Sequence, residues 1–123
     1  MAVNRMILGG RYQESRHTGT FNGMPFEGIS TVGYDNSKKK LFSTWIDNMG
    51  SGIMMLEGTW DDASRTMNFS GRQIDPVTQQ DTEIRETMKL IDDNNQLMEM
   101  FMKPVGGEEF KTMEIKFTRK VNS

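Results

Sequence analysis

The sequence predicts an all-β protein, an antiparallel meander of about nine short strands that forms a barrel or a strongly curved open barrel. Turn-forming residues recur at short intervals along the 123-residue chain, and several segments between them alternate apolar and polar residues with the period of two expected of strands. Two Ala and five Leu are too few for a helical bundle. A sheet of this size with no helices to cover it favours curvature into a barrel.

Turn chemistry delimits the first four expected strands, at residues 2–8, 11–21, 25–34 and 40–47. Gly9-Gly10 and Asn22-Gly23 tolerate positive φ, and Asp35-Asn36-Ser37 can bond to its own backbone. The next strand is expected at 52–60, after Asn48-Met49-Gly50, because Met54, Leu56, Gly58 and Trp60 share one face.

The remaining strands are expected at residues 65–73, 81–91, 95–103 and 109–120. Turn residues at 61–64, at Asp75-Pro76, at 92–95 and at 104–107 separate them. The charge density of 81–91 suits a helix, but its β-branched residues favour a strand. In each of these strands the alternate residues are apolar: Met67 and Phe69; Ile84, Met88 and Leu90; Met98, Met100 and Met102; Met113, Ile115 and Phe117.

Length and charge exclude several classes of protein. One core suffices for 123 residues, and no linker or repeat interrupts them, so residues 1–123 are expected to form a single domain. A net charge of −2 argues against nucleic-acid binding, and zero Cys excludes a disulfide framework. No apolar run is long enough for a membrane helix and no signal peptide follows Met1, so we expect a cytoplasmic protein without a membrane partner.

Recognised enzyme and metal motifs are missing from the sequence. His17 is the only histidine, which excludes a multi-histidine metal site within one chain; haem binding through His17 alone has weak support, and we expect no cofactor. Ser15 and His17 share a strand face, but such pairs arise by chance and nothing in the sequence supplies a third catalytic group. We expect Asp61-Asp62 and Asp92-Asp93 to form turns rather than calcium ligands, and Lys38-Lys39-Lys40 to be a solvated hairpin flank.

Two polar features stand out among the expected strands. Neither face of residues 11–18 is apolar, so this segment is either an exposed edge strand or the wall of a polar cavity that Tyr12 and Arg16 would line. Glu86 interrupts an otherwise apolar face and must be paired, hydrogen-bonded or wet. An ion pair with an arginine is the favoured interpretation, and a cavity residue is the alternative.

The 12 methionines serve either as core filler, the favoured interpretation, or as an adaptable ligand surface. Met98, Met100 and Met102 face opposite to Leu97, Glu99 and Phe101, and strand 95–103 looks apolar on both sides. One of those two faces is a candidate interface with another chain.

The chain also resembles a bacterial family of uncharacterised proteins, domain of unknown function 1579, from about Arg5 to Lys120. Turn glycines and strand aromatics carry the resemblance: Leu8-Gly9-Gly10-Arg11-Tyr12, Thr18-Gly19-Thr20-Phe21, Met24-Pro25-Phe26-Glu27-Gly28, Gly33-Tyr34-Asp35, Ser43-Thr44-Trp45-Ile46-Asp47, Met55-Leu56-Glu57-Gly58, Arg85-Glu86 and Met113-Glu114-Ile115.

The resemblance implies a lipocalin-like, calycin-type antiparallel barrel, and it implies no reaction, cofactor or catalytic residue. Family members usually carry a further N-terminal segment with a short helix and a Trp-containing strand. Because Met1 lies close to the Gly9-Gly10 corner, we expect this strand to be missing and a barrel edge to be open. An open sheet edge favours pairing with a second copy, so we expect a homodimer formed by strand addition or by the apolar faces near Met98–Met102.

These observations favour a non-enzymatic module that binds a small hydrophobic or amphipathic molecule, since small barrels accept one such ligand. The expected ligand-binding residues are Tyr12, Arg16, Trp45, Asp47 and Glu86. One alternative is a structural protein with a filled barrel that acts through homodimer assembly. Another is an enzyme with a polar cavity in which Glu86, Asp47 or His17 acts as acid or base.

Overall fold

The computed structural model describes residues 1–74 and 79–119. Within these residues it contains nine β-strands and no helix. The strands are β1 (Ala2–Ile7), β2 (Tyr12–Phe21), β3 (Met24–Asp35), β4 (Lys40–Asp47), β5 (Met54–Asp61), β6 (Thr66–Ile74), β7 (Asp81–Asp92), β8 (Asn95–Lys103) and β9 (Phe110–Thr118). The turn expected at Asp75-Pro76 and the end of the last expected strand at Lys120 lie outside the described residues.

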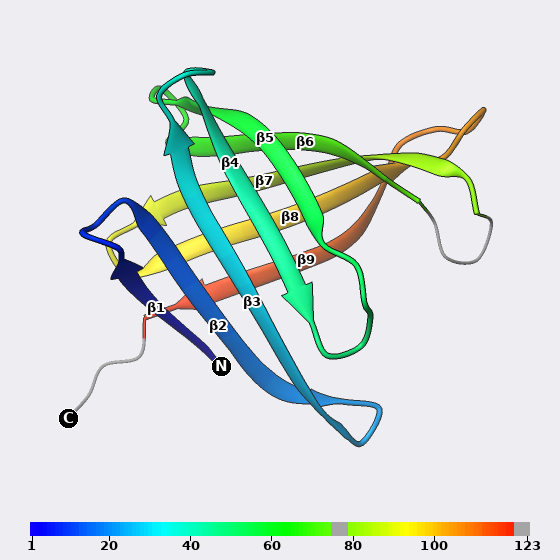
Figure 1. Ribbon diagram of the computed structural model, residues 1–123, viewed down its shortest axis with the longest axis horizontal. Coiled ribbons are helices and arrows are strands. Elements are labelled where there is room, and N and C mark those ends of the chain that lie inside the picture. Colours follow the sequence, from blue (N-terminus) through cyan, green and yellow to red (C-terminus); the bar gives the residue numbers. More distant parts are fainter. Residues whose placement is uncertain (75–78, 120–123) are drawn as a thin grey trace. The chain divides into compact units, whose positions relative to one another are not determined.

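The strands follow one another in the order β1 to β9, and neighbours in this order are hydrogen-bonded (Figure 1). Every pairing whose register is known is antiparallel. The all-β class and the antiparallel meander predicted from the sequence are therefore confirmed, and each strand was placed to within two residues.

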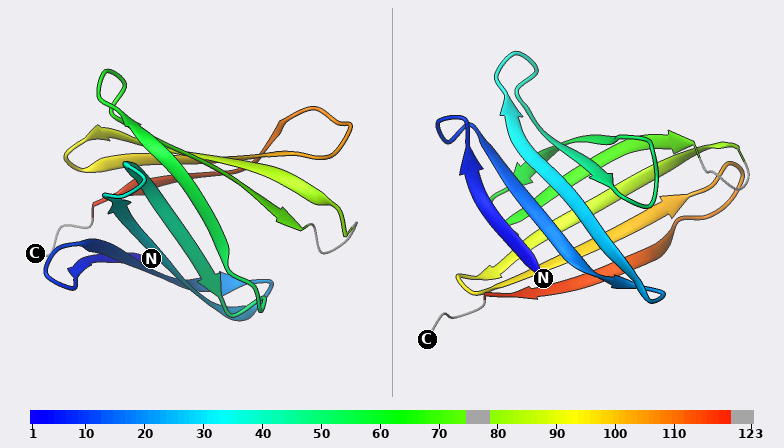
Figure 2. Two further views of the ribbon diagram at one scale, coloured as in Figure 1. Left: turned by 45° about the horizontal axis from the view of Figure 1, so that its top comes forward. Right: turned by 60° about the horizontal axis from the view of Figure 1, so that its bottom comes forward.

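The chain divides into two compact units, Met1–Glu57 and Gly58 to the C-terminus. The first unit contains β1 to β4 and the first half of β5; the second contains the rest of β5 and β6 to β9. The views in Figure 2 show β1 to β4 side by side in the first unit and β6 to β9 side by side in the second.

In the first unit β2 lies between β1 and β3. The interpretation of residues 11–18 as an exposed edge strand is therefore wrong. Its charges are paired within the sheet: the Glu14 carboxylate accepts a hydrogen bond from Arg5 Nε on β1 at 3.3 Å and one from Arg16 Nε on β2 itself at 3.2 Å. Polar residues can thus occupy an internal strand when their neighbours supply the partners.

The β2–β3 hairpin shows how the local sequence sets the register of this unit. Asn22 and Gly23 both have positive φ, 51° and 78°, which is the backbone of a two-residue hairpin turn. The turn joins the flanking pair Phe21 and Met24 and fixes the alignment along the hairpin to Tyr12 opposite Gly33.

The second unit has one strongly apolar face, which we call the methionine face. Cross-strand registers place on it three rows of β6 to β9 residues: Met67, Met88, Met98 and Ile115; Phe69, Glu86, Met100 and Met113; and Gly71, Ile84, Met102 and Phe110. Phe69, Ile84 and Met98 are buried, with exposed fractions of 3%, 3% and 8%. Met67, Met88, Met100 and Met102 are half-buried.

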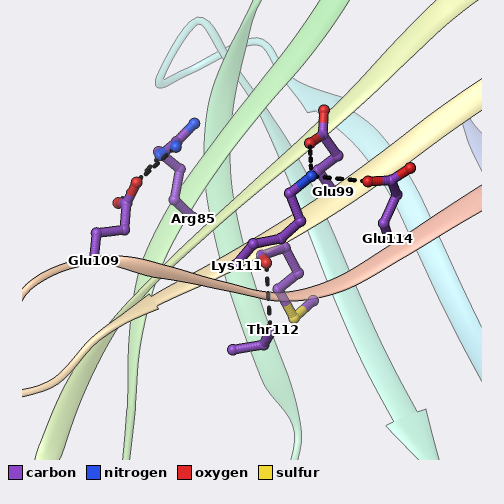
Figure 3. Close-up of polar contacts among 7 residues, drawn as sticks. Arg85, Glu99, Glu109, Lys111, Thr112 and Glu114 are labelled. Carbon is purple, nitrogen blue, oxygen red and sulfur yellow. Dashed lines mark hydrogen bonds and ion pairs between the residues drawn. The ribbon is translucent and has the colours of Figure 1, made fainter.

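The opposite face of β7 to β9 is charged (Figure 3). Lys111 Nζ lies 2.8 Å from both the Glu99 and the Glu114 carboxylates, and Arg85 pairs with Glu109 at 2.7 Å. The Arg85 guanidinium also lies 4.1 Å from the centre of the Phe101 ring. Strand 95–103 is therefore not apolar on both sides, because charged neighbours cover Phe101 on one of them.

Several turn interpretations are confirmed. The Asp61 and Asp92 carboxylates accept hydrogen bonds from the backbone N–H groups of Ala63 and Asn94, two residues further on. Lys38 and its two neighbours are exposed beside the β3–β4 turn, and Lys38 Nζ forms an ion pair with Glu57 at 2.8 Å.

Candidate functional site

An aromatic cluster occupies one face of the first unit. Trp45 lies edge-on to His17 with ring centres 5.3 Å apart, and it stacks on Phe26 at 6.2 Å. The Trp45 ring also covers Gly28, where a Cβ atom would lie only 2.3 Å from the ring. Gly28 leaves the space that the indole fills, so this glycine and this aromatic form one packing unit.

Asp47 fixes the orientation of Trp45. One carboxylate oxygen accepts the indole N–H at 2.7 Å, and the other accepts the backbone N–H groups of Met49 and Gly50 at 2.9 and 3.1 Å. Since both oxygens already have partners, Asp47 is committed to holding the indole and the β4–β5 turn. In this arrangement it is a positioning residue.

Ser15 and His17 meet as the sequence allowed, with 3.0 Å between Ser15 Oγ and His17 Nε2. The Ser15 hydroxyl, however, donates to Asn4 Oδ1 at 2.5 Å. A hydroxyl has one proton, so His17 must donate to Ser15 in this arrangement, which is the reverse of a base that activates a nucleophile. Burial, and secondarily the positive N-terminus, lowers the pKa of His17, which favours its neutral form.

A shallow cavity of about 240 Å³ lies at the same end of this sheet. Arg16 and Asp47 are among its lining residues, together with the apolar side chains of Ile29 and Ile46. The cavity lies within the first unit, where β2, β3 and β4 are paired.

The structure separates the five predicted ligand-binding residues into three groups. Trp45 and Asp47 are bonded to each other. Tyr12 and Arg16 belong to the other face of the same sheet, although Arg16 and Asp47 both line the cavity at its end; Tyr12 contacts Phe42 across Gly33, with ring centres 6.0 Å apart. Glu86 lies in the second unit.

Glu86 is the exceptional group of the second unit. It lies between Phe69 and Met100 in the cross-strand row, with Ile84 and Met88 as neighbours on its own strand. Within residues 1–74 and 79–119, the structure records no hydrogen bond or ion pair to its carboxylate. The favoured ion pair with an arginine is therefore wrong: the adjacent Arg85 points to the other face and binds Glu109.

Burial raises the pKa of Glu86 from 4.5 to about 6. The cause is loss of hydration, because a carboxylate among methionine and phenylalanine side chains loses water without gaining a compensating charge. A perturbed carboxylate on an apolar face is a candidate functional group, since such groups cost stability and can receive a ligand's polar atoms.

Sequence reasoning missed the part that Phe26 and His17 take in the Trp45 cluster. Strands at 25–34 and 40–47 were predicted from the turns that flank them, but the register that brings these rings together was not. Gly28, opposite Asp47 in the register, was the available signal, because a glycine inside a strand marks close approach by a neighbour.

Two further findings concern metals and membranes. Across the part of the chain that the structure describes, no three His, Asp or Glu side chains gather closely enough to hold a metal ion. Among the same residues, no helix is long and apolar enough to cross a membrane.

The fold and these sites define an all-β chain with one antiparallel meander and an ionisable group on an apolar face. The family model described as protein of unknown function (DUF1579) matches residues 1–119. The chain therefore belongs to this family, which confirms the resemblance drawn from its turn glycines and strand aromatics. No curated protein matches the chain.

Proposed function

We propose that this chain is a binding module for a small amphipathic molecule, whose apolar part lies on the methionine face and whose polar group meets Glu86. The observation that carries the proposal is the carboxylate of Glu86, half-buried among apolar side chains without a recorded polar partner in the described residues. A group of this kind is costly to keep in a fold unless it interacts with something.

The surroundings of Glu86 support a ligand of moderate size. Met67, Met88, Met100 and Met102 are each half-buried, so part of their surface is accessible. Methionine side chains are flexible and polarisable and repack around different shapes. The family likeness to lipocalin-type proteins, drawn from the sequence, points to the same kind of ligand.

The charge of Glu86 indicates the polar group of the ligand. Above its pKa of about 6 the carboxylate is ionised and accepts hydrogen bonds only. A cationic or hydrogen-bond-donating group would restore the interactions lost on burial, and a ligand carboxylate would be repelled. An aliphatic amine therefore fits this site best, and an alcohol fits less well.

Native mass spectrometry with octylamine, octanol and octanoate tests the proposal near neutral pH. We expect one octylamine per chain, weaker binding of octanol and none of octanoate. Glu86→Gln should weaken octylamine binding at least about tenfold, because a hydrogen bond to a charged group contributes about 1.5–3 kcal/mol and about 1.4 kcal/mol corresponds to a factor of ten. The matched control is Glu83→Gln, which makes the same change on the same strand at an exposed carboxylate paired with Arg72.

The alternative function, a filled fold that acts through assembly, predicts a different result. In that case no adduct forms with any of the three compounds and none raises the melting temperature. Equal loss of octylamine binding in the Glu83→Gln control would also contradict a role for Glu86.

A further inference from the structure

Besides Glu86, the second unit has one further unusual feature, a sheet edge on β9 to which no strand is paired among the described residues. β9 is the last strand in the order and pairs only with β8 among the described residues. Its other edge therefore presents backbone N–H and C=O groups without a strand partner. Natural sheets protect such edges with proline, bulges or inward-pointing charges, because an unprotected edge pairs with another chain.

The second half of β9 lacks two of these protections. A register shift at Met100 and Phe101 accommodates an extra residue near the start of β9. From Met113 to Thr118, in contrast, the pairing with β8 is regular, and no proline interrupts it. A regularly paired segment of this kind is a suitable template for a further strand.

The sequence of this segment is complementary to itself. In an antiparallel pair with a two-fold axis at Ile115, Glu114 of each copy faces Lys116 of the other. Met113 faces Phe117 in the same pair, and the two Ile115 side chains face each other. Moving the axis to Glu114 or Lys116 instead places two like charges opposite each other, which disfavours both registers.

The charges already present around Glu114 favour this register. Lys111 lies between the Glu99 and Glu114 carboxylates, so one positive charge serves two negative ones (Figure 3). Lys116 makes no ion pair with any described residue of its own chain. A second copy would bring its Lys116 to Glu114, so that two positive charges would balance the two carboxylates.

Association would also cover exposed apolar side chains of this segment. Met113 is 45% exposed although it lies in a row with Phe69 and Met100 on the methionine face. The partner's Phe117 would cover it in the pair centred at Ile115, and the apolar row would continue from one copy into the next.

We propose that two copies of this chain associate through β9, antiparallel about Ile115, with Glu114 and Lys116 paired twice across the two-fold axis. The contact is isologous, so it closes on itself and yields a dimer rather than a filament. This proposal is independent of the ligand proposed above, because it requires neither Glu86 nor a bound molecule.

Charge reversal tests the register. Sedimentation velocity over a concentration series should give a dimer for the unmodified chain. Glu114→Lys and Lys116→Glu should each weaken dimerisation about tenfold, because each variant places like charges opposite each other at two symmetric positions. The double variant exchanges the two residues and should restore dimerisation to nearly the original strength. Circular dichroism verifies that each variant is folded.

Lys89→Glu is the matched control, since it makes the same charge change on β7, two strands from the edge, and should leave dimerisation unchanged. A monomer at every concentration would overturn the proposal. So would a dimer that neither single variant weakens, or one that Arg5→Glu on β1 weakens instead. Failure of the double variant to recover would exclude this register.

Discussion

Gly58→Ala is expected to destabilise the protein by more than about 3 kcal/mol, within the range of the largest single-substitution effects. A Cβ atom on Gly58 would lie 1.7 Å from the Asn68 carbonyl oxygen and 2.8 Å from the Phe69 Cα atom. These are backbone atoms of β6, so no side-chain rotation can relieve the overlap. The strands must separate, and buried Phe69 would lose packing as a result.

Urea unfolding monitored by tryptophan fluorescence measures this effect as a lower midpoint. The control is Gly52→Ala, because a Cβ atom there meets nothing within 4 Å and the φ of Gly52 is not positive. That variant should be neutral or slightly stabilised, since alanine reduces the entropy of the unfolded chain. Similar midpoints for the two variants would contradict the close approach of β5 to β6.

Glu86→Gln is expected to stabilise the protein at neutral pH by up to about 2 kcal/mol, because each pKa unit corresponds to about 1.36 kcal/mol. Burial raises the pKa of Glu86 to about 6 in the folded protein, above its ordinary value of 4.5. Between these values the folded state binds more protons than the unfolded state, so the contribution of Glu86 to the free energy of unfolding falls as pH rises. The cost is fully developed above about pH 6.

The difference in stability between the unmodified chain and Glu86→Gln is expected to depend on pH. At about pH 4 the unmodified chain and Glu86→Gln should unfold at similar urea concentrations, since Glu86 and the glutamine that replaces it are then both neutral. At about pH 7.5 the variant should be the more stable of the two. Glu83→Gln, on the exposed side of the same strand, should show no gain at either pH. A less stable Glu86→Gln variant at high pH would mean that the carboxylate has a stabilising partner.

The fold was largely predictable because its signals are local. Asn22-Gly23 is typical of a two-residue hairpin turn, and turn residues bracket 40–47 and 95–103 closely enough that both ends of β4 and β8 were predicted. The strand expected at 2–8 ends at Ile7, one residue earlier than predicted, because Leu8 adopts a positive φ of 53° at the corner. Such a conformation is uncommon for leucine and has no local signature.

The sites were less predictable because they depend on register. Glu86 could be placed on an apolar face from alternation, but its lack of an arginine partner follows from Arg85 pointing to the other face toward Glu109. Likewise, the polar residues of β2 suggested an edge until pairing with both neighbours was known. Alternation assigns a residue to one of two faces, and only register identifies its neighbours.

Methyl resonances of methionine test the central claim most directly, the claim that an amphipathic molecule lies on the methionine face with its polar group at Glu86. With ¹³C-methyl methionine, addition of octylamine should shift the resonances of Met67, Met88, Met98, Met100 and Met102, and Glu86→Gln should reduce those shifts. Exposed Met6, Met24 and Met55 in the first unit serve as internal controls and should not move. Shifts confined to the controls, or no shift at saturating octylamine, would contradict the claim.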